Sequence, residues 1–473
     1  MYWLLFSTEF KGAIEIKTAA LLTSPATLQS FPDCLSCPKL RNWRLSLGLS
    51  CVNFSIKRLT ALAILAAAGT AFAQSSVTVF GTVDANLRSV TSGDNKFMGM
   101  AQDGATSSRI GFRGVEDLGG GLRANFHMEG ALNPDTGTAG GFNFMRQSTV
   151  GVAGGFGEVR LGRDLTPMFR LNGIVDPFGF IGVGGSANMF GSTVIAESLG
   201  NSGALGAQDA QDGTSTFTTT DRGTERRTDA SGLRAGALTT PRITFADPNG
   251  VRASNSFAYY TPNFNGFTAS LMYSAGAENT NGLKNVGKMT SGSVNYTKGP
   301  LVLAAATQAT KGGVTAAAAS FVGSGTTANT AVAATNGTGD MKWTTNYLAG
   351  SYDLKVVKLS LGHRTEKLSE GGETFGKLKS TIYGVSAPIG AITLRASYIT
   401  KKADLTDVTE GSIKAGNQFA VGAVYELSKR TALYGTYSQL KNENGFANSI
   451  GSAVASAGGV TSKGYEFGVR HNF

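Results

Sequence analysis

The chain has 473 residues, of which 41% are hydrophobic and 16% charged, and its formal net charge is +10. No apolar run reaches the roughly 18–20 residues that cross a membrane as a helix, which excludes a helical membrane protein. Lysine and arginine are neither clustered nor interleaved with aromatic residues, which argues against a nucleic-acid partner.

The N-terminal part of the chain carries a targeting pattern. The basic pair Lys57-Arg58 precedes an apolar run and then the small-residue sequence AFA, which ends just before Gln74. This order is typical of a secretory signal peptide, here 56–73, although a short buried helix is an alternative. Residues 1–55 differ in composition, and we interpret them as a mis-annotated extension that precedes the true start.

The cysteines all belong to this upstream part. Cys34, Cys37 and Cys51 precede Gln74, so the mature chain has no thiol. Cys34 and Cys37 have C-x-x-C spacing, but neither a second pair nor a histidine cluster accompanies them. We therefore expect no metal site and no cofactor.

Short segments in which apolar and polar residues alternate follow one another to the end of the chain. This period of two predicts β-strands rather than helices. The predicted strands are 77–87, 107–117, 122–131, 146–153, 157–163, 252–260, 267–273, 289–297, 301–308, 344–353, 356–364, 378–387, 391–399, 418–426, 431–439 and 465–473.

The hairpin formed by 107–117 and 122–131 shows the pattern best, with a glycine run at its turn. Its apolar face carries Ile110, Phe112, Leu122, Ala124, Phe126 and Met128, and its charged face carries Arg109, Arg113, Arg123, Asn125, His127 and Glu129. Such a hairpin fits a soluble sandwich, or an outer-membrane barrel whose apolar face meets lipid and whose charged face lines water.

The lengths of the connections favour the barrel. Short turns alternate with long polar connections, as short periplasmic turns alternate with long external loops in outer-membrane barrels. The long connections are 88–106, 132–145, 164–251, 274–288, 309–343, 365–377, 400–417 and 440–463. We therefore predict an all-β fold, a 16-stranded antiparallel transmembrane β-barrel over 74–473.

The last strand supports the same interpretation. In GYEFGVRHNF, the side chains Tyr465, Phe467, Val469 and Phe473 share one face, and the chain ends on the aromatic residue. We expect these four residues to act as the terminal signal for the barrel-assembly machinery.

Several segments resemble, in order, the general porins of beta-proteobacteria and Neisseria. They are the signal peptide, SSVTVFGTVDANL, SSRIGFRGVEDLGGGLRANFHMEG, FNFMRQSTVGVAGGFGEVRLGRD, RASNSFAYYTPNFNGF and GYEFGVRHNF. The resemblance implies a homotrimer in the cell outer membrane that lets ions and small hydrophilic solutes diffuse passively. It also implies that the third external loop, 164–251, folds inward and narrows the channel. In this chain that loop is long, and QDAQDGTSTFTTTDRGTERRTDASG reads as an insertion.

A diffusion channel depends on fixed charge around a narrow aqueous passage. Strand parity predicts five basic side chains on the channel wall: Arg109, Arg113, Arg123, Arg160 and Arg252. The resemblance implies Arg109, Arg146 and Arg252 as the basic side of the constriction, although parity is ambiguous for Arg146. It suggests Asp164 and Asp176 as acidic partners on the third loop. Such a row of arginines would favour anions, whereas ordinary hydrated wall charges are the alternative for each.

Other functions find less support in the sequence. His127, His363 and His471 are the only histidines, and no nucleophile-elbow, zinc-protease or phosphate-loop motif occurs, so we expect no catalytic residue and no enzyme. A barrel whose loops bind partners, such as an adhesin, remains open and is compatible with a channel.

Overall fold

The computed structural model describes residues 76–137, 143–190, 214–218, 242–246, 250–276, 287–315, 341–405, 412–444, 446–451 and 458–473. The predicted signal peptide 56–73 and the extension 1–55 lie outside the described residues.

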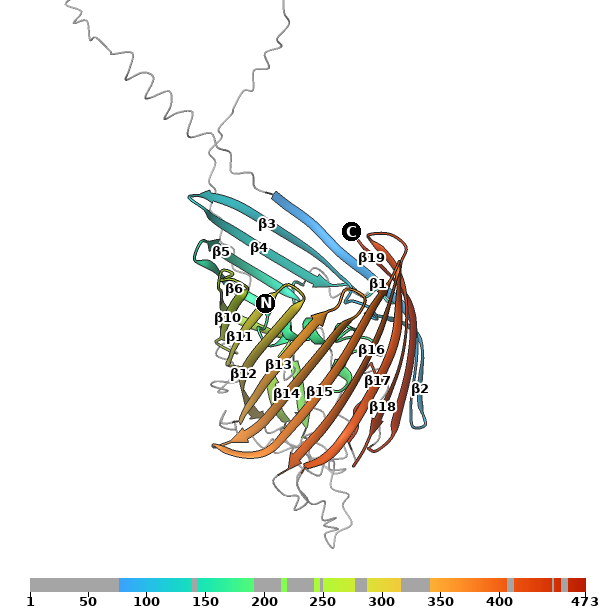
Figure 1. The fold of residues 1–473 in the computed structure, drawn as a ribbon. Coiled ribbons are helices and arrows are strands. Elements are labelled where there is room, and N and C mark those ends of the chain that lie inside the picture. The colour runs from blue at the N-terminus through green and yellow to red at the C-terminus, as the bar shows by residue number, and fades with distance from the viewer. Residues whose placement is uncertain are drawn as a thin grey trace, which may run out of the picture. The chain divides into compact units, whose positions relative to one another are not determined.

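Antiparallel strands form most of the described chain (Figure 1). Alternation of apolar and polar side chains gives each strand one apolar and one polar face. The strands of the main sheet are β1 Ser76–Ser92, β2 Asn95–Gln102, β3 Arg109–Gly119, β4 Leu122–Ala131, β5 Gln147–Gly154, β6 Gly157–Leu165, β9 Arg252–Tyr260, β10 Phe267–Ser274, β11 Met289–Lys298, β12 Leu301–Thr315, β13 Met341–Asp353, β14 Lys358–Glu370, β15 Glu373–Ile389, β16 Ile392–Leu405, β17 Ser412–Glu426, β18 Thr431–Asn442 and β19 Thr461–Asn472.

The sheet closes on itself. From β3 onward each strand of the main sheet pairs with the next one, and β6 pairs with β9. β1 pairs with β2, with β3 and, along Thr82–Ser92, with β19. In Figure 1 the blue strand β1 accordingly lies beside the red strand β19. Because β2 and β3 pair with successive halves of β1, they occupy one position, and the barrel has sixteen. The predicted 16-stranded barrel is confirmed.

The connection between β2 and β3 is held by one carboxylate. Asp84 on β1 accepts backbone N–H bonds from Gly104 at 3.2 Å, Ala105 at 2.9 Å and Thr106 at 2.9 Å, and the hydroxyl of Tyr434 also donates to it. These bonds fix the short interruption in this wall position, where the chain leaves β2 and enters β3.

Several predicted loops are wrong in their bounds. The expected loop 88–106 is largely the end of β1 and all of β2, and 365–377 is a strand pair that turns at Gly371-Gly372, both with positive φ. Strands that extend beyond the lipid have water on both faces, so their sequences lose the apolar alternation that marks a strand. The glycine turn of the first hairpin is confirmed, with positive φ at Gly119, Gly120 and Gly121.

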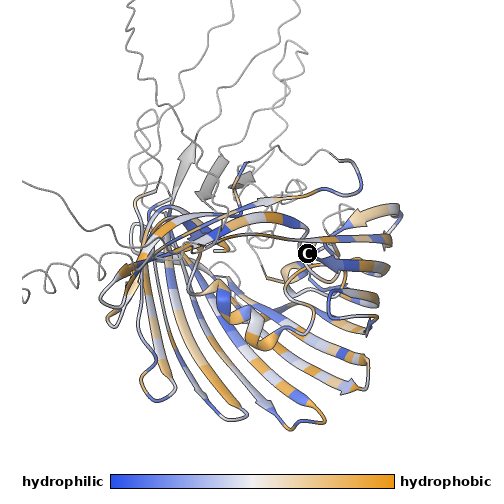
Figure 2. Ribbon diagram, turned by 90° about the horizontal axis from the view of Figure 1, so that it is seen from above, coloured by the Kyte–Doolittle hydropathy of each residue, from blue (hydrophilic) through white to orange (hydrophobic). Residues whose placement is uncertain are grey.

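The two faces of the barrel differ as expected. On β19, Tyr465 and Phe467 are 58% and 61% exposed, whereas Glu466 between them is 3% exposed. Hydrophobic and hydrophilic residues alternate along the strands in Figure 2. The exposed apolar side chains form the outer face, which is the face that meets lipid in a membrane barrel.

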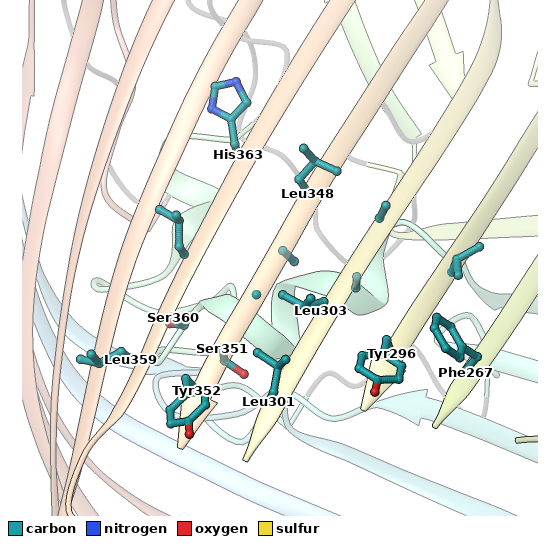
Figure 3. Close-up of a pocket in the computed structure, with 16 residues that line it drawn as sticks. Phe267, Tyr296, Leu301, Leu303, Leu348, Ser351, Tyr352, Leu359, Ser360 and His363 are labelled. Atoms are coloured by element: carbon teal, nitrogen blue, oxygen red, sulfur yellow. The ribbon is translucent and has the colours of Figure 1, made fainter. Parts of the chain in front are cut away.

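The outer face is hollowed over β10–β14. Leu303, Leu348 and Leu361 line this hollow, and Tyr296 and Tyr352 stand at its lower rim beside the short turns (Figure 3). Its lining is apolar, so the hollow belongs to the hydrocarbon-facing surface and not to an aqueous passage.

Residues 166–190 follow β6 and contain η1 Phe169–Leu171, α2 Asn172–Val175 and η2 Ser186–Asn188. No helix in the described ranges is long and apolar enough to cross a membrane. Four side chains on three strands donate to carbonyl oxygens of this segment: Ser360 to Val175 at 2.8 Å, Arg395 to Pro177 at 3.2 Å, Lys401 to Met189 at 2.6 Å, and Gln418 to Gly184 at 3.0 Å. Its apolar side chains are buried, among them Met168, Leu171, Val175 and Val183.

Two further short strands, β7 Thr214–Thr218 and β8 Arg242–Ala246, pair with each other, and β8 also pairs with the end of β12. β7 lies within the predicted insertion. The rest of the insertion lies outside the described residues.

Candidate channel-wall site

A first ion-pair group surrounds Glu129 on β4. The Nε atom of Arg146 donates to Glu129 Oε1 at 2.7 Å, and Arg109 Nε lies 3.8 Å from Oε2. His127 Nε2 lies 3.5 Å from the same oxygen. Arg109 keeps 30% of its side chain exposed, against 11% for Arg146, so Arg109 is the more accessible charge of this group.

Arg146 reaches Glu129 because it precedes β5 rather than lying within it. Gln147, the first residue of β5, pairs with Glu129, and the Arg146 backbone N–H donates to the Glu129 carbonyl oxygen at 3.1 Å. Strand parity therefore does not apply to Arg146. Its side chain turns to the same side as Glu129.

Arg252 lies next to this group. Its Nε atom donates to the carbonyl oxygen of Arg146 at 2.7 Å, and the residue is 9% exposed. Asn255 has a φ of +51° and interrupts the alternation of β9, so parity alone does not determine the direction of the Arg252 side chain. In the resulting register Ala253, not Arg252, pairs with Asp164.

A second ion-pair group surrounds Asp164 at the end of β6. Its carboxylate contacts Arg160 Nη1 at 2.7 Å and Arg170 Nη2 at 3.1 Å, and the hydroxyl of Tyr260 donates to it at 3.1 Å. Arg160 also contacts Glu158 at 2.8 Å. Both guanidinium groups lie over the ring of Tyr260, at 4.9 and 5.6 Å from its centroid, which is cation–π geometry.

A bulge between β6 and β9 lies beside Asp164, where two steps along β6 oppose three steps along β9. The register shifts between Gly162 and Asp164, and Gly162 has a φ of +121°. Only glycine adopts this conformation without strain. The Asp164 side chain is 1% exposed and pairs with Arg160, four residues earlier on the same face of its own strand.

A polar cavity of about 510 Å³ lies beside the second group, lined among others by Arg113, Gln147, Glu158, Arg160 and Arg170. Arg113 also lies over the ring of Phe80, 5.1 Å from its centroid.

Arg123 does not join either group. It pairs with Asp117 beside the glycine turn, six residues from Glu129, or about 20 Å along the strand. The predicted row of arginines is therefore divided between two ion-pair groups, the cavity wall and the turn.

The Asp176 carboxylate is hydrogen-bonded to the backbone of its own segment. Its carboxylate accepts backbone N–H bonds from Phe178 at 2.8 Å, Phe180 at 2.9 Å and Ser186 at 2.8 Å. Burial raises its pKa above the usual range, and these bonds oppose the rise. Among the described residues its hydrogen bonds go to its own segment and none goes to an arginine.

The sequence reasoning missed Arg170, and it named Glu129 only as part of a charged face. Arg170 lies in the three-residue helix η1, which is too short for a residue pattern to predict the direction of a side chain. Glu129 and Glu158 share the parity of Arg123 and Arg160, respectively, so charge balance along the strands was the signal that could have identified them.

A closed barrel with an apolar outer face and charged groups behind it defines the class of transmembrane β-barrels. The profile of the Gram-negative porin family matches residues 59–445, and the chain belongs to this family. It is thus a channel-forming protein of the outer membrane.

Individual relatives agree with this assignment. Outer membrane porin protein 32 of Delftia acidovorans is 35% identical over 88% of this chain and 99% of its own length. Major outer membrane protein P.IB of Neisseria meningitidis is 34% identical over 25% of this chain and 36% of its own. A solved structure described as an anion-selective porin from Comamonas acidovorans superposes with a TM-score of 0.61 at 31% identity, covering 85% of this chain and all of that one.

Proposed function

We propose that this porin prefers anions, and that the two ion-pair groups are its selectivity element. The observation that carries the proposal is the surplus of positive charge. Five arginines, Arg109, Arg146, Arg160, Arg170 and Arg252, are gathered with four carboxylates: Glu129, Glu158 and Asp164, which form ion pairs with them, and Asp103, which lies near Arg109 and Arg146. Fixed charge beside a narrow aqueous passage raises the local concentration of ions of opposite sign. The relative described as anion-selective supports the same preference.

We further propose that loop 164–251 folds inward through residues 166–190 and narrows the channel. The hydrogen bonds from Ser360, Arg395, Lys401 and Gln418 to this segment support the proposal, because these donors come from β14, β16 and β17 while the segment begins at β6. Arg170, near the start of the segment, stays beside the wall residue Arg160, with which it shares the Asp164 carboxylate. Ions and small hydrophilic solutes then pass between the segment and the wall, without a catalytic group.

Bilayer recording in a KCl gradient tests the preference. The wild-type reversal potential is expected to have the sign that indicates a preference for anions. Arg109→Glu combined with Arg170→Glu replaces the two most exposed cations of the groups, whose side chains are 30% and 40% exposed. In this double variant the reversal potential should shift toward the sign that indicates a preference for cations.

The matched control is Arg123→Glu combined with Arg430→Glu. It makes the same charge change at two exposed positions by the short turns. It should leave the reversal potential close to the wild-type value. Equal shifts in the two double variants would show that selectivity does not reside in the ion-pair groups.

Two assembly properties complete the proposal. We infer a homotrimer, expected to give conductance steps in threes. We also infer recognition of Tyr465, Phe467, Val469 and Phe473 by the barrel-assembly machinery. Phe473 exchanges backbone hydrogen bonds with Gly81 at 3.1 Å. Phe473→Ala should lower the amount of folded barrel in the outer membrane, measured by heat-dependent gel mobility, whereas His471→Ala should not. Equal yields of the two variants would refute the role of Phe473.

A further inference from the structure

The outer face carries a feature that ion conduction does not use, the hollow over β10–β14 shown in Figure 3. We call it the apolar hollow, and its volume is about 900 Å³. Its lining crosses neighbouring strands in register, because Tyr296 pairs with Leu303 and Leu303 pairs with Gly350. Leu303 and Leu348 are 48% and 61% exposed, so these side chains face away from the channel.

Two small residues create the apolar hollow. Ala305 pairs with Leu348, and Gly350 lies between Leu303 on one neighbouring strand and Leu361 on the other. Alanine and glycine leave space among these leucines, so the hollow reaches the level of the main chain. The alanine that precedes each of them also lines the hollow, although its own side chain is buried on the channel side.

Polar side chains bound the apolar hollow toward the long loops. The Thr307 hydroxyl donates to the side-chain oxygen of Asn346 at 2.8 Å, and His363 Nδ1 lies 2.9 Å from the Thr381 hydroxyl. On β12 the apolar stretch before these groups runs from Leu301 to Ala305, about 13 Å along the strand. An apolar chain that enters from the short turns therefore finds a surface of limited length.

The opposite end of the apolar hollow is aromatic and basic. Tyr296 and Tyr352 stand at its lower rim beside the short turns (Figure 3). Lys298 lies two residues beyond Tyr296 on the same face of β11 and pairs with Leu301 of the lining. Lys355 is exposed in the turn between β13 and β14. Because aromatic girdles lie at the boundary between hydrocarbon and headgroups, both lysines lie at the level of the headgroups.

This basic rim is not neutralised by the protein. In the part of the chain that the structure describes, no carboxylate forms an ion pair with Lys298 or Lys355. The nearby Asp353 accepts the backbone N–H of Lys355 at 2.7 Å, and it pairs in the sheet with Lys358. Since Tyr352 points outward, alternation turns Asp353 toward the other face.

We propose that the apolar hollow binds the acyl chains of an anionic phospholipid from the leaflet on the short-turn side, with the phosphate at the basic rim of Lys298 and Lys355. The two strands that lead to these lysines are two strand spacings apart, about 10 Å, which suits one headgroup between them. Each ammonium group offers three donors to phosphate oxygens. Methylene groups in the hollow gain dispersion contacts with the leucines around it.

A second copy of the barrel fits this surface less well. In a symmetric contact, the same patch of both copies would meet, and the lysines of one rim would face those of the other. An anionic lipid instead brings the charge that the rim lacks. The proposal rests on the outer-membrane barrel and does not depend on ion preference.

The test uses the full barrel refolded in detergent, titrated with phosphatidylglycerol and, separately, with phosphatidylcholine that carries the same acyl chains. Native mass spectrometry counts the lipids and the barrels in each particle. Phosphatidylglycerol should bind the wild type at least about tenfold more tightly than phosphatidylcholine. Added salt should reduce this difference, because it screens the attraction between phosphate and ammonium groups.

A first pair of variants tests the basic rim. The rim variant is Lys298→Gln with Lys355→Gln. Its matched control is Lys429→Gln with Arg430→Gln, which makes the same charge change on the exposed turn between β17 and β18. The rim variant should lose the preference for phosphatidylglycerol, and the control should keep it.

A second pair of variants tests the apolar hollow itself. The filling variant is Ala305→Leu with Gly350→Ala, where the added Cβ atom at 350 would lie 3.2 Å from Leu303 Cδ2. Its matched control is Ala423→Leu with Gly435→Ala, at two directly paired positions of β17 and β18. The filling variant should bind both lipids about fivefold more weakly than the control, because fewer contacts remain for the chains.

Three results would overturn the proposal. The first is equal binding of the two lipids by the wild type, a comparison that needs no variant to fold. The second is equal lipid binding by the filling variant and its control. The third is a changed number of barrels per particle in the filling variant with unchanged lipid binding, which would assign the apolar hollow to a second copy of the chain.

Discussion

Arg88 on β1 and Glu466 on β19 form a buried ion pair across the closure of the barrel, with Nη2 and Oε2 2.9 Å apart. The two residues pair directly in the sheet, and their side chains are 8% and 0% exposed. The other carboxylate oxygen of Glu466 accepts the Val183 N–H at 3.3 Å. One carboxylate thus joins the first strand, the last strand and the segment 166–190.

Removal of either partner should destabilise the barrel strongly, because the remaining charge would be buried and unpaired. Arg88→Ala is expected to lower the free energy of unfolding by about 3–5 kcal/mol, measured by urea titration of the protein in detergent. Arg470→Ala, which breaks the more exposed pair with Glu426 at the short-turn end, should cost less than about 1 kcal/mol. An equal decrease in the free energy of unfolding in the two variants would contradict a special role of the Arg88–Glu466 pair.

Asp164→Asn should increase anion preference. The variant keeps the shape of the side chain but removes the negative charge shared by Arg160 and Arg170. The reversal potential in a KCl gradient should move further to the anion side, with a stability loss of about 1–3 kcal/mol. Asp353→Asn, on an exposed short turn, is the control. No difference from that control would exclude Asp164 from the selectivity element.

Asp176→Ala should loosen residues 166–190, since three backbone N–H groups lose their acceptor. Each buried unsatisfied group costs about 1–3 kcal/mol. Single-channel currents should become noisier, with larger mean conductance, while the barrel stays folded by gel mobility. Asp176→Asn retains one acceptor oxygen, so its current noise and mean conductance should lie between those of the wild type and of Asp176→Ala. Wild-type currents in both variants would show that Asp176 does not hold the segment.

Gly162→Ala should disturb the bulge between β6 and β9. A Cβ atom there would collide with the Ser148 carbonyl oxygen, and a φ of +121° strains any side-chain-bearing residue. The expected loss is about 1–3 kcal/mol in the free energy of unfolding. Gly155→Ala, where nothing lies within 4 Å of the added atom, should cost much less. Equal unfolding curves for the two variants would contradict the requirement for glycine at position 162 in the bulge.

The sequence predicts the membrane-spanning part of the fold well, because lipid on one face and water on the other impose a period of two. The hairpin 107–131 has its predicted turn at Gly119–Gly121, and β3 and β4 have nearly the predicted bounds. Beyond the lipid this constraint disappears. The sequence therefore predicts a loop where the structure has β2, and again at the end of β14 around Lys367.

The candidate site could be predicted only in part, for a related reason. Arg109 and Arg160 lie on regular strands, and parity identifies them as wall residues. Arg146 precedes its strand and Arg252 lies beside the irregular residue Asn255, so side-chain direction depends on local backbone geometry. Arg170 and Asp176 lie in a segment whose position is set by contacts with distant strands.

Those distant contacts share one chemical property. The wall donors Ser360, Arg395, Lys401 and Gln418 all bond to carbonyl oxygens of residues 166–190, which every amino acid possesses. The path of the segment is therefore encoded largely by the wall, while outward-pointing side chains of the segment are free to vary. Point substitutions in the segment can therefore change which solutes pass through the channel while the backbone path of the segment stays the same.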